Sequence, residues 1–221
     1  MLSKSFVKAL CLTAMLTIQA SGCAFTDITA ELPLTGPTID FSGGEGQVLV
    51  LTPFTDKRQM SNRIGMKKNG YGQDTADVFP NKDVLPWLHE RLSSELKAAG
   101  FTVATNNANR GDVEVNGTLL KLFIEPVIQW STVDHEADFS VQLQVKRPDG
   151  LKATRKYYVK GINQGLIASQ GHYTAALNKA TMTLMKRVVA DLINLLNQYP
   201  ETINHSNLRI TPCGKLEQDF V

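Results

Sequence analysis

The ten residues Ala137-Asp138-Phe139-Ser140-Val141-Gln142-Leu143-Gln144-Val145-Lys146 alternate apolar and polar side chains without a break. Successive side chains of a β-strand point to opposite faces, so this stretch predicts a strand with one face on a hydrophobic core and the other toward water. One-sided burial of this kind is typical of antiparallel sheets. The stretch therefore decides the expected fold, an antiparallel sheet covered on one face.

The residues that follow extend the antiparallel pattern. Arg147-Pro148-Asp149-Gly150 has the chemistry of a tight turn, and residues 151–160 alternate again. Lys152, Lys156 and Lys160 fall on one side of this second strand, which is typical of a protected sheet edge. The glycine-bearing stretch 161–165 (GINQG) is interpreted as a turn rather than a phosphate-binding loop.

The preceding segment adds further strands. Residues 112–125 (DVEVNGTLLKLFIE) predict a long strand whose apolar side changes between Gly117 and Leu120, so we expect a bulge or a sharp bend there. Residues 48–54 (VLVLTPF) predict a buried strand, and residues 101–104 predict a short one.

Two helices complete the expected domain. The first begins near Asp83 with Pro86 in its first turn and ends at Gly100. Its apolar positions recur every three or four residues: Leu85, Leu88, Leu92, Leu96 and Ala99. The second spans about residues 172–199, before Pro200. The prediction is an α+β two-layer sandwich, with a mostly antiparallel sheet and both helices on one face.

A long polar segment, residues 55–82, separates the first strand from the first helix. Asn69-Gly70 favours a hairpin, with Ile64 and Met66 on one arm and Tyr71 on the other. A connection of this length is often functional. The candidate partner-binding residues are five cations of the segment and, outside it, one tryptophan near a predicted strand end: Lys57, Arg58, Arg63, Lys67, Lys68 and Trp130. The alternative to the hairpin is a mobile loop, and the alternative to a binding role for the cations is a solvated hairpin.

The N-terminus has the pattern of an export signal. Lys4 and Lys8 precede the apolar run Ala9–Ile18, which is too short to span a bilayer. Ser21-Gly22-Cys23 then resembles a bacterial lipobox, although Ala20 stands where leucine is usual. The resemblance implies that Cys23 becomes the first residue and carries the lipid. Ala24 in place of aspartate implies sorting to the outer membrane.

This resemblance predicts four parts. They are a signal peptide (1–22), the lipidated Cys23 with a flexible tether (23–46), the periplasmic α+β domain (47–200) and a C-terminal tail (201–221). The tether is expected because its prolines and glycines lack periodicity. With Cys11 removed and Cys23 acylated, Cys213 stands alone; without acylation, a Cys23–Cys213 disulfide is the alternative.

Charge and motifs exclude several function classes. Without residues 1–22 the chain has 21 basic and 21 acidic residues. It therefore lacks the excess positive charge that is typical of nucleic-acid-binding proteins. No hydrolase, P-loop, dinucleotide or zinc motif occurs, and we expect no enzyme activity, cofactor or metal site. Around His135, the acids Asp134, Glu136 and Asp138 fall on the opposite side of the predicted strand, which indicates a polar strand start.

Six features of the sequence carry a family resemblance: the lipobox, VLVLTPFTD, WLHERLSSELKAAGF, VNGTLLKLFIE, the strands around RPDG and LNKATMTLMKRVVADLINLL. Together they resemble YajG-like bacterial outer-membrane lipoproteins, over residues 48–199. The resemblance implies a lipoprotein without known catalytic residues, in which only Cys23 is a functional position. We therefore expect a non-enzymatic accessory or assembly module of an envelope machine, held to the membrane through Cys23 and facing a protein partner. The alternative is a module that binds lipid or glycan in a groove between helix and sheet.

Overall fold

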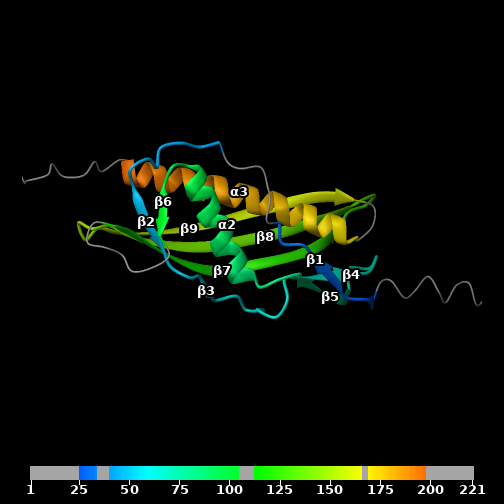
Figure 1. Cartoon of the computed structure of the whole chain (residues 1–221). Helices are drawn as coiled ribbons and strands as arrows, with labels where there is room; N and C mark the ends of the chain where they lie inside the picture. Colours follow the sequence, from blue (N-terminus) through cyan, green and yellow to red (C-terminus); the bar gives the residue numbers. More distant parts are fainter. Residues whose placement is uncertain (1–24, 34–39, 105–111, 166–168, 198–221) are drawn as a thin grey trace, which may run out of the picture.

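The computed structural model describes residues 25–33, 40–104, 112–165 and 169–197 (Figure 1). The elements in chain order are β1 (Ile28–Ala30), β2 (Val48–Leu51), β3 (Thr55–Asp56), β4 (Gly65–Lys68), β5 (Asp74–Pro80), α2 (Val84–Ala98), β6 (Thr102–Ala104), β7 (Val113–Ile128), β8 (Val133–Lys146), β9 (Lys152–Gly165) and α3 (Gln170–Asn197). They form the predicted α+β sandwich, with one sheet and both helices on one of its faces.

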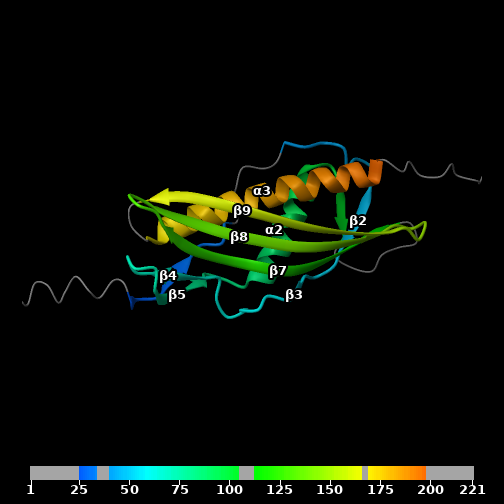
Figure 2. The same cartoon turned by 180° about the vertical axis from the view of Figure 1, so that it is seen from behind.

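The three longest strands form the antiparallel meander β7-β8-β9, with β9 at the edge of the sheet (Figure 2). The predicted bulge is confirmed, because the β7–β8 register passes from Leu119↔Val141 to Lys121↔Ser140 and leaves Leu120 without a partner. The prediction of a turn at 161–165 is wrong, since β9 continues to Gly165. The reason is Gly161, where an added Cβ would lie 2.2 Å from the Ala176 carbonyl oxygen of α3. The glycine lets the helix approach the strand.

The other edge of β7 is shared by three short strands. β2, β3 and β4 pair with successive parts of β7, all in parallel, at Leu49↔Val113, Thr55↔Thr118 and Gly65↔Ile124. The sheet then extends from β2 to β6 at one end, and from β4 to β5 and β1 at the other. β7 is therefore the common neighbour that aligns the N-terminal strands with the meander.

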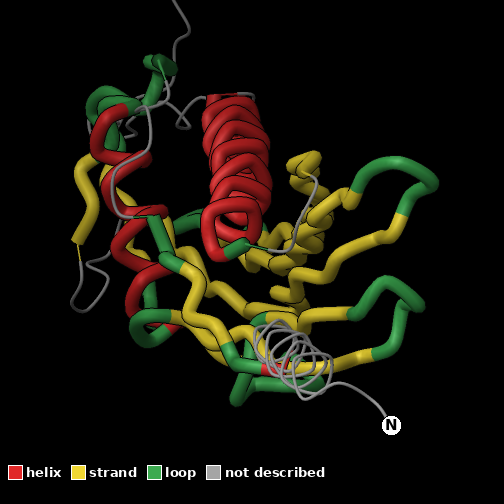
Figure 3. Tube along the Cα trace, turned by 90° about the vertical axis from the view of Figure 1, so that its right-hand side faces the viewer, coloured by secondary structure: helices red, strands yellow, loops and turns green. Residues whose placement is uncertain are grey.

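Both helices cover the same face of the meander (Figure 3). The α2 residue Trp87 stacks on Phe139 of β8, with ring centroids 6.1 Å apart. α3 packs on β9 at Gly161, whose partner Ala137 lies on the same face of β8 as Phe139. Burying these apolar faces supplies the core, in which Trp87, Phe139 and Tyr173 are each at most 1% exposed.

The first helix follows its sequence signals with two differences. Asp83 occupies the N-cap position, but its side chain makes no capping hydrogen bond. The buried stripe also contains Arg91 and Glu95, a charged pair spaced by one helical turn, which the apolar pattern did not reveal. Gly100 ends the helix with a φ of 96°, as its place after the last turn predicts.

Part of the predicted tether belongs to the folded domain. Residues 28–30 form β1, and Ala30 and Leu32 are buried. The Trp87 indole donates a hydrogen bond to the Pro33 carbonyl at 2.8 Å, and the Asn81 side chain accepts one from the Leu32 amide. The expectation of a free tether through residue 46 therefore fails for residues 28–33, because these residues complete the edge of the sheet.

Candidate functional site

The cations of residues 55–82 are the first candidate site, and most of them bond within the fold. Arg58 pairs with Asp56, Arg63 with Asp77, and Lys68 with Glu125 of β7. The Lys67 ammonium is buried and donates to the Thr26 carbonyl at 3.0 Å. Lys57 is exposed, and no ion pair involves it in the part of the chain that the structure describes. The predicted basic patch is thus mostly structural.

Arg58 shows how the fold uses these charges. Its guanidinium holds Asp56 through two nitrogens and also donates to the Ser61 carbonyl at 3.0 Å, while only 5% of its side chain is exposed. The Arg58 hydrogen bond is the main cause that lowers the pKa of Asp56 below its ordinary value. The pair fixes the chain between β3 and β4 rather than presenting a cation to a partner.

The hairpin at Asn69-Gly70 is confirmed, with a different tip from the one expected. β4 and β5 are its arms, and Tyr71 lies in the connecting turn rather than on an arm. The Asn69 carboxamide oxygen accepts the amide hydrogens of Tyr71 and Gln73, at 3.0 Å each, and closes the turn. The turn leaves the Tyr71 side chain 93% exposed.

Trp130 occupies the corresponding position in the β7–β8 turn. The turn is closed by a 2.9 Å bond from the Gln129 amide to the Thr132 carbonyl, and Trp130 is fully exposed. Because β4 and β7 run in parallel at Gly65↔Ile124, the turns that follow them lie at the same end of the sheet (Figure 1). The sequence indicated Trp130 as a candidate site residue. It did not indicate Tyr71, because the exposure of this side chain depends on its place in the β4–β5 turn.

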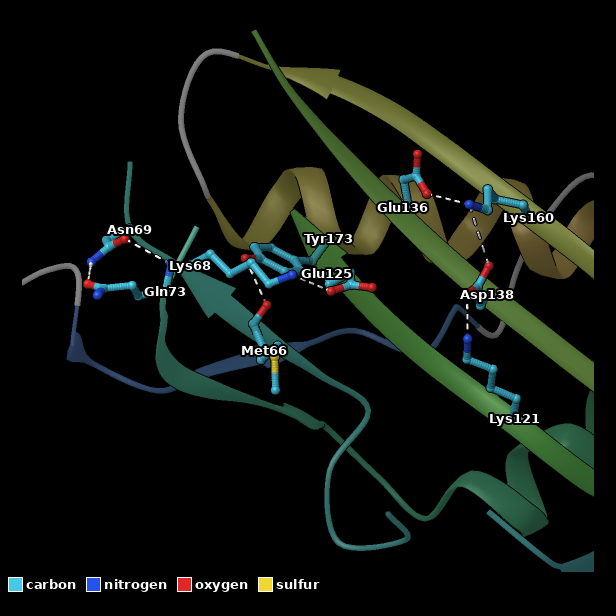
Figure 4. A network of polar contacts seen from close by, with 10 residues as sticks. All are labelled: Met66, Lys68, Asn69, Gln73, Lys121, Glu125, Glu136, Asp138, Lys160 and Tyr173. Carbon is cyan, nitrogen blue, oxygen red and sulfur yellow. Dashed lines mark hydrogen bonds and ion pairs between the residues drawn. The ribbon is translucent and has the colours of Figure 1, made fainter. Parts of the chain in front are cut away.

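A polar network lies on the sheet face opposite the helices (Figure 4). Asp138 of β8 accepts hydrogen bonds from Lys121 of β7 at 2.6 Å and from the Tyr158 hydroxyl of β9 at 2.6 Å. Lys160 pairs with Glu136 and approaches Asp138 at 3.9 Å. Burial would raise the pKa of Asp138, but the bonds from Lys121 and Tyr158 outweigh it and the pKa is lowered. The Asp138 hydrogen bond in turn raises the pKa of Tyr158.

On the helix face, His135 is completely buried. Its ring stacks on His172 with centroids 5.1 Å apart and meets the edge of Tyr173 at 4.8 Å. Neither His135 nitrogen makes a hydrogen bond of ordinary geometry with a described residue. Burial lowers the pKa of His135, and nearby His172 adds to this, while the Asn163 backbone and Asp134 oppose it. His135 is thus on the opposite face from Glu136 and Asp138, as the alternation predicts.

A cavity of about 570 Å³ opens beside the first turn of α2. Asp56, Arg58, Lys82 and Asp83 contribute to its walls, together with Phe79 and Val84. The cavity borders the chain segment before β4 and does not extend along the packed interface between α2 and β8. Its charged walls suit a polar group better than an acyl chain.

Within the described ranges, no cluster of three or more histidine, cysteine or carboxylate side chains could hold a metal ion. No described helix has the length and apolar character needed to cross a membrane. Cys23, the predicted lipidation site, and Cys213 lie outside the described residues, as do the signal peptide and the C-terminal tail.

Comparison with solved structures shows that the fold is an established one. A protein of Xanthomonas campestris superimposes with a TM-score of 0.55 at 13% identity, over 78% of this chain and 97% of that one. A putative neuraminyllactose-binding hemagglutinin homolog from Helicobacter pylori gives 0.42 at 13% identity, over 73% and 94%. A minor lipoprotein of Acinetobacter baumannii gives 0.38 at 9%, over 66% and 94%. Of these three, only the first has a TM-score above 0.5, and at 13% identity it supports a conclusion about the fold alone.

The sequence itself identifies the family. Comparison with curated proteins finds no match. Residues 43–198 match the model of a family described as "Uncharacterized lipoprotein", and the matched range contains every strand and helix from β2 to the end of α3. No enzymatic family is indicated. The chain therefore belongs to this family of bacterial lipoproteins.

Proposed function

We propose that this protein is a non-enzymatic lipoprotein, anchored in the outer membrane through lipid on Cys23, that presents its domain in the periplasm to an envelope protein. Membership in a lipoprotein family supports an anchor of this kind. The Ser21-Gly22-Cys23 pattern and the likeness to YajG-like lipoproteins support Cys23 as the modified residue. Ala24 in place of aspartate supports the outer membrane.

The observation that carries the proposal is the helix-free face of β7, β8 and β9. These strands have 16, 14 and 14 residues. At about 3.3 Å per residue and 4.8 Å between strands, this face covers roughly 650 Å². A standard protein interface buries about 800 Å² per partner, so the face has the size of one side of such an interface.

The charges of this face favour a specific partner over a generic anion. Lys121 and Lys160 are matched by Glu136 and Asp138, so the network has no net charge and little attraction for anions at long range. Its hydrogen bonds hold the side chains in one arrangement, and such preorganisation lowers the entropy lost when a partner binds. The basic residues of the 55–82 segment contribute less, because Arg58, Arg63 and Lys68 are paired internally.

The lipid-binding form of the alternative, an acyl chain held in a groove between helix and sheet, has less support. The interface between α2 and β8 is filled by Trp87 and Phe139, and the cavity beside α2 has charged walls. Neither provides the apolar channel that an acyl chain needs.

Two experiments test the proposal. Metabolic labelling with a fatty-acid analogue should label the natural chain and not the Cys23→Ser variant; equal labelling of both would disprove the anchor. A photo-crosslinking residue at Ser140, on the open face, should capture a reproducible envelope protein. The same residue at Lys186, on the exposed side of α3, is the matched control. Capture at Lys186 but not at Ser140 would contradict the assignment of the face.

A further inference from the structure

The largest exposed hydrophobic side chains gather at one end of the molecule. Phe25 is 67% exposed, Tyr71 93% and Trp130 100%, and these are the highest values among the large hydrophobic residues that the structure describes. A monomeric domain gains nothing in water from exposing three aromatic rings at one place. We call these three residues the aromatic end.

Strand directions place the three residues together. The turns with Tyr71 and Trp130 follow the parallel strands β4 and β7. β1 pairs with β5 in parallel at Ile28↔Val78, and β5 is antiparallel to β4. The residues before Ile28 therefore run toward the β4–β5 turn. Two bonds fix them there, from Lys67 to the Thr26 carbonyl and from the Asp77 amide to the Asp27 carboxylate at 2.8 Å. Figure 3 looks onto this end.

Covalent geometry then limits where the lipid can be. Phe25 is two residues after Cys23, and a chain extends by at most about 3.6 Å per residue. The Cα of Cys23 is therefore within roughly 7 Å of the Cα of Phe25. A lipid on Cys23 must enter the bilayer beside the aromatic end, because β1 leaves no long tether between the anchor and the sheet.

The chemistry of the turns suits a membrane interface. Asn69, Gly70, Gly72 and Gln73 surround Tyr71, and Gln129, Ser131 and Thr132 surround Trp130, so neither turn carries a charge. Lys68, at the base of the first turn, is paired with Glu125 (Figure 4). Tryptophan and tyrosine favour the headgroup region, where the ring is in apolar surroundings and its polar atom reaches water.

We propose that the aromatic end rests on the bilayer that holds the lipid of Cys23, with Phe25, Tyr71 and Trp130 in the headgroup region. This inference rests on the proposed lipidation of Cys23. It orients the domain, since the meander strands then lead away from the membrane for about 45 Å. The β8–β9 turn around Gly150 is at the far end. The contact is made by aromatic rings and uncharged turns, so it does not require anionic lipid.

The test uses the lipidated protein in vesicles of zwitterionic phospholipid brominated near the headgroup. Trp130 fluorescence should be quenched at least about twofold more than that of a tryptophan placed at the far turn, in the variant Trp130→Phe with Asp149→Trp. Trp87 is buried and contributes the same background to both. Flotation of the vesicles reports the anchor separately. Protein that floats with equal quenching at both positions would overturn the orientation and leave the anchor standing. Protein that fails to float would overturn both.

A second measurement uses the unlipidated Cys23→Ser chain. Replacing Tyr71 and Trp130 together by serine should lower its weak partitioning into the same vesicles by about tenfold, the ratio that corresponds to 1.4 kcal/mol. Leu151→Ser, an exposed residue beside the far turn, is the matched control and should leave partitioning unchanged. Equal partitioning of the double variant and the natural chain would contradict the proposal.

Discussion

The ammonium group of Lys67 lies 3.0 Å from the backbone carbonyl oxygen of Thr26, three residues after Cys23. Lys67 is only 6% exposed. A cation of the β4–β5 hairpin thus holds the start of the described chain against the sheet. Lys67 was predicted to meet an external partner, and in the structure its ammonium group bonds to the residues that begin the described chain.

Lys67→Met should loosen this attachment without unfolding the protein. The variant keeps the apolar stem and loses a charge-assisted hydrogen bond, a contribution of about 1.5–3 kcal/mol. Hydrogen exchange at the amides of Ile28, Thr29 and Ala30 should accelerate by about tenfold or more. Lys57→Met, at an exposed position on the neighbouring segment, should leave these amides unchanged. Equal exchange in the two variants would show that Lys67 does not hold β1.

His135 should make the protein less stable in weak acid. Its pKa in the fold is lowered from 6.5, chiefly by burial, so the unfolded chain binds a proton that the folded chain excludes. The free energy of unfolding is therefore highest above the unfolded pKa. It should fall as pH decreases below about 6.5, by up to about 1.4 kcal/mol per unit.

The measurement is urea unfolding between neutral pH and about pH 5. His135→Phe should flatten the pH dependence in this range, because phenylalanine keeps a ring between His172 and Tyr173 and does not titrate. A slope that persists in His135→Phe would assign it to another group.

Gly161→Ala should destabilise the fold strongly. The new methyl group would lie 2.2 Å from the Ala176 carbonyl and 2.4 Å from the Ala180 amide nitrogen, so α3 must move away from β9. Overpacking of this kind costs about 3 kcal/mol at its upper range. Gly70→Ala meets nothing within 4 Å and should change the free energy of unfolding by less than about 0.5 kcal/mol. Similar denaturant midpoints for both variants would contradict the close approach of α3.

Asp138→Asn should lower the pKa of Tyr158 toward 10.0. The raised value depends first on the hydrogen bond to the Asp138 carboxylate, which disfavours the phenolate. Ultraviolet absorbance of the phenolate during a pH titration measures the change, and Tyr158→Phe identifies which step belongs to this residue. Stability should change little, since partly exposed pairs contribute about 0–1 kcal/mol. An unaltered titration would mean that the network does not form in solution.

The sequence predicted the features that depend on neighbours along the chain. Alternation from Ala137 to Lys146, the bulge before Lys121 and the stop at Gly100 are local patterns, and each is found in the structure. The hairpin at Asn69-Gly70 was predicted for the same reason.

The features it missed depend on partners distant in sequence. Lys68 meets Glu125 across 57 residues and Lys67 meets Thr26 across 41, so the spacing of the cations could not reveal that they are engaged. Residues 161–165 were predicted as a turn because glycine often marks one. Here Gly161 instead accommodates α3, which no local pattern indicates.

The position of β7 has a consequence for the order in which the chain can fold. β3 pairs with β7, and β2 pairs with β6 and β7, so these early strands have no described sheet neighbour before residue 102. Synthesis from the N-terminus makes residues 48–56 available well before the strands that they pair with. Pairing at this separation forms slowly. β2 and β3 therefore complete their pairing only after the β7 segment is present.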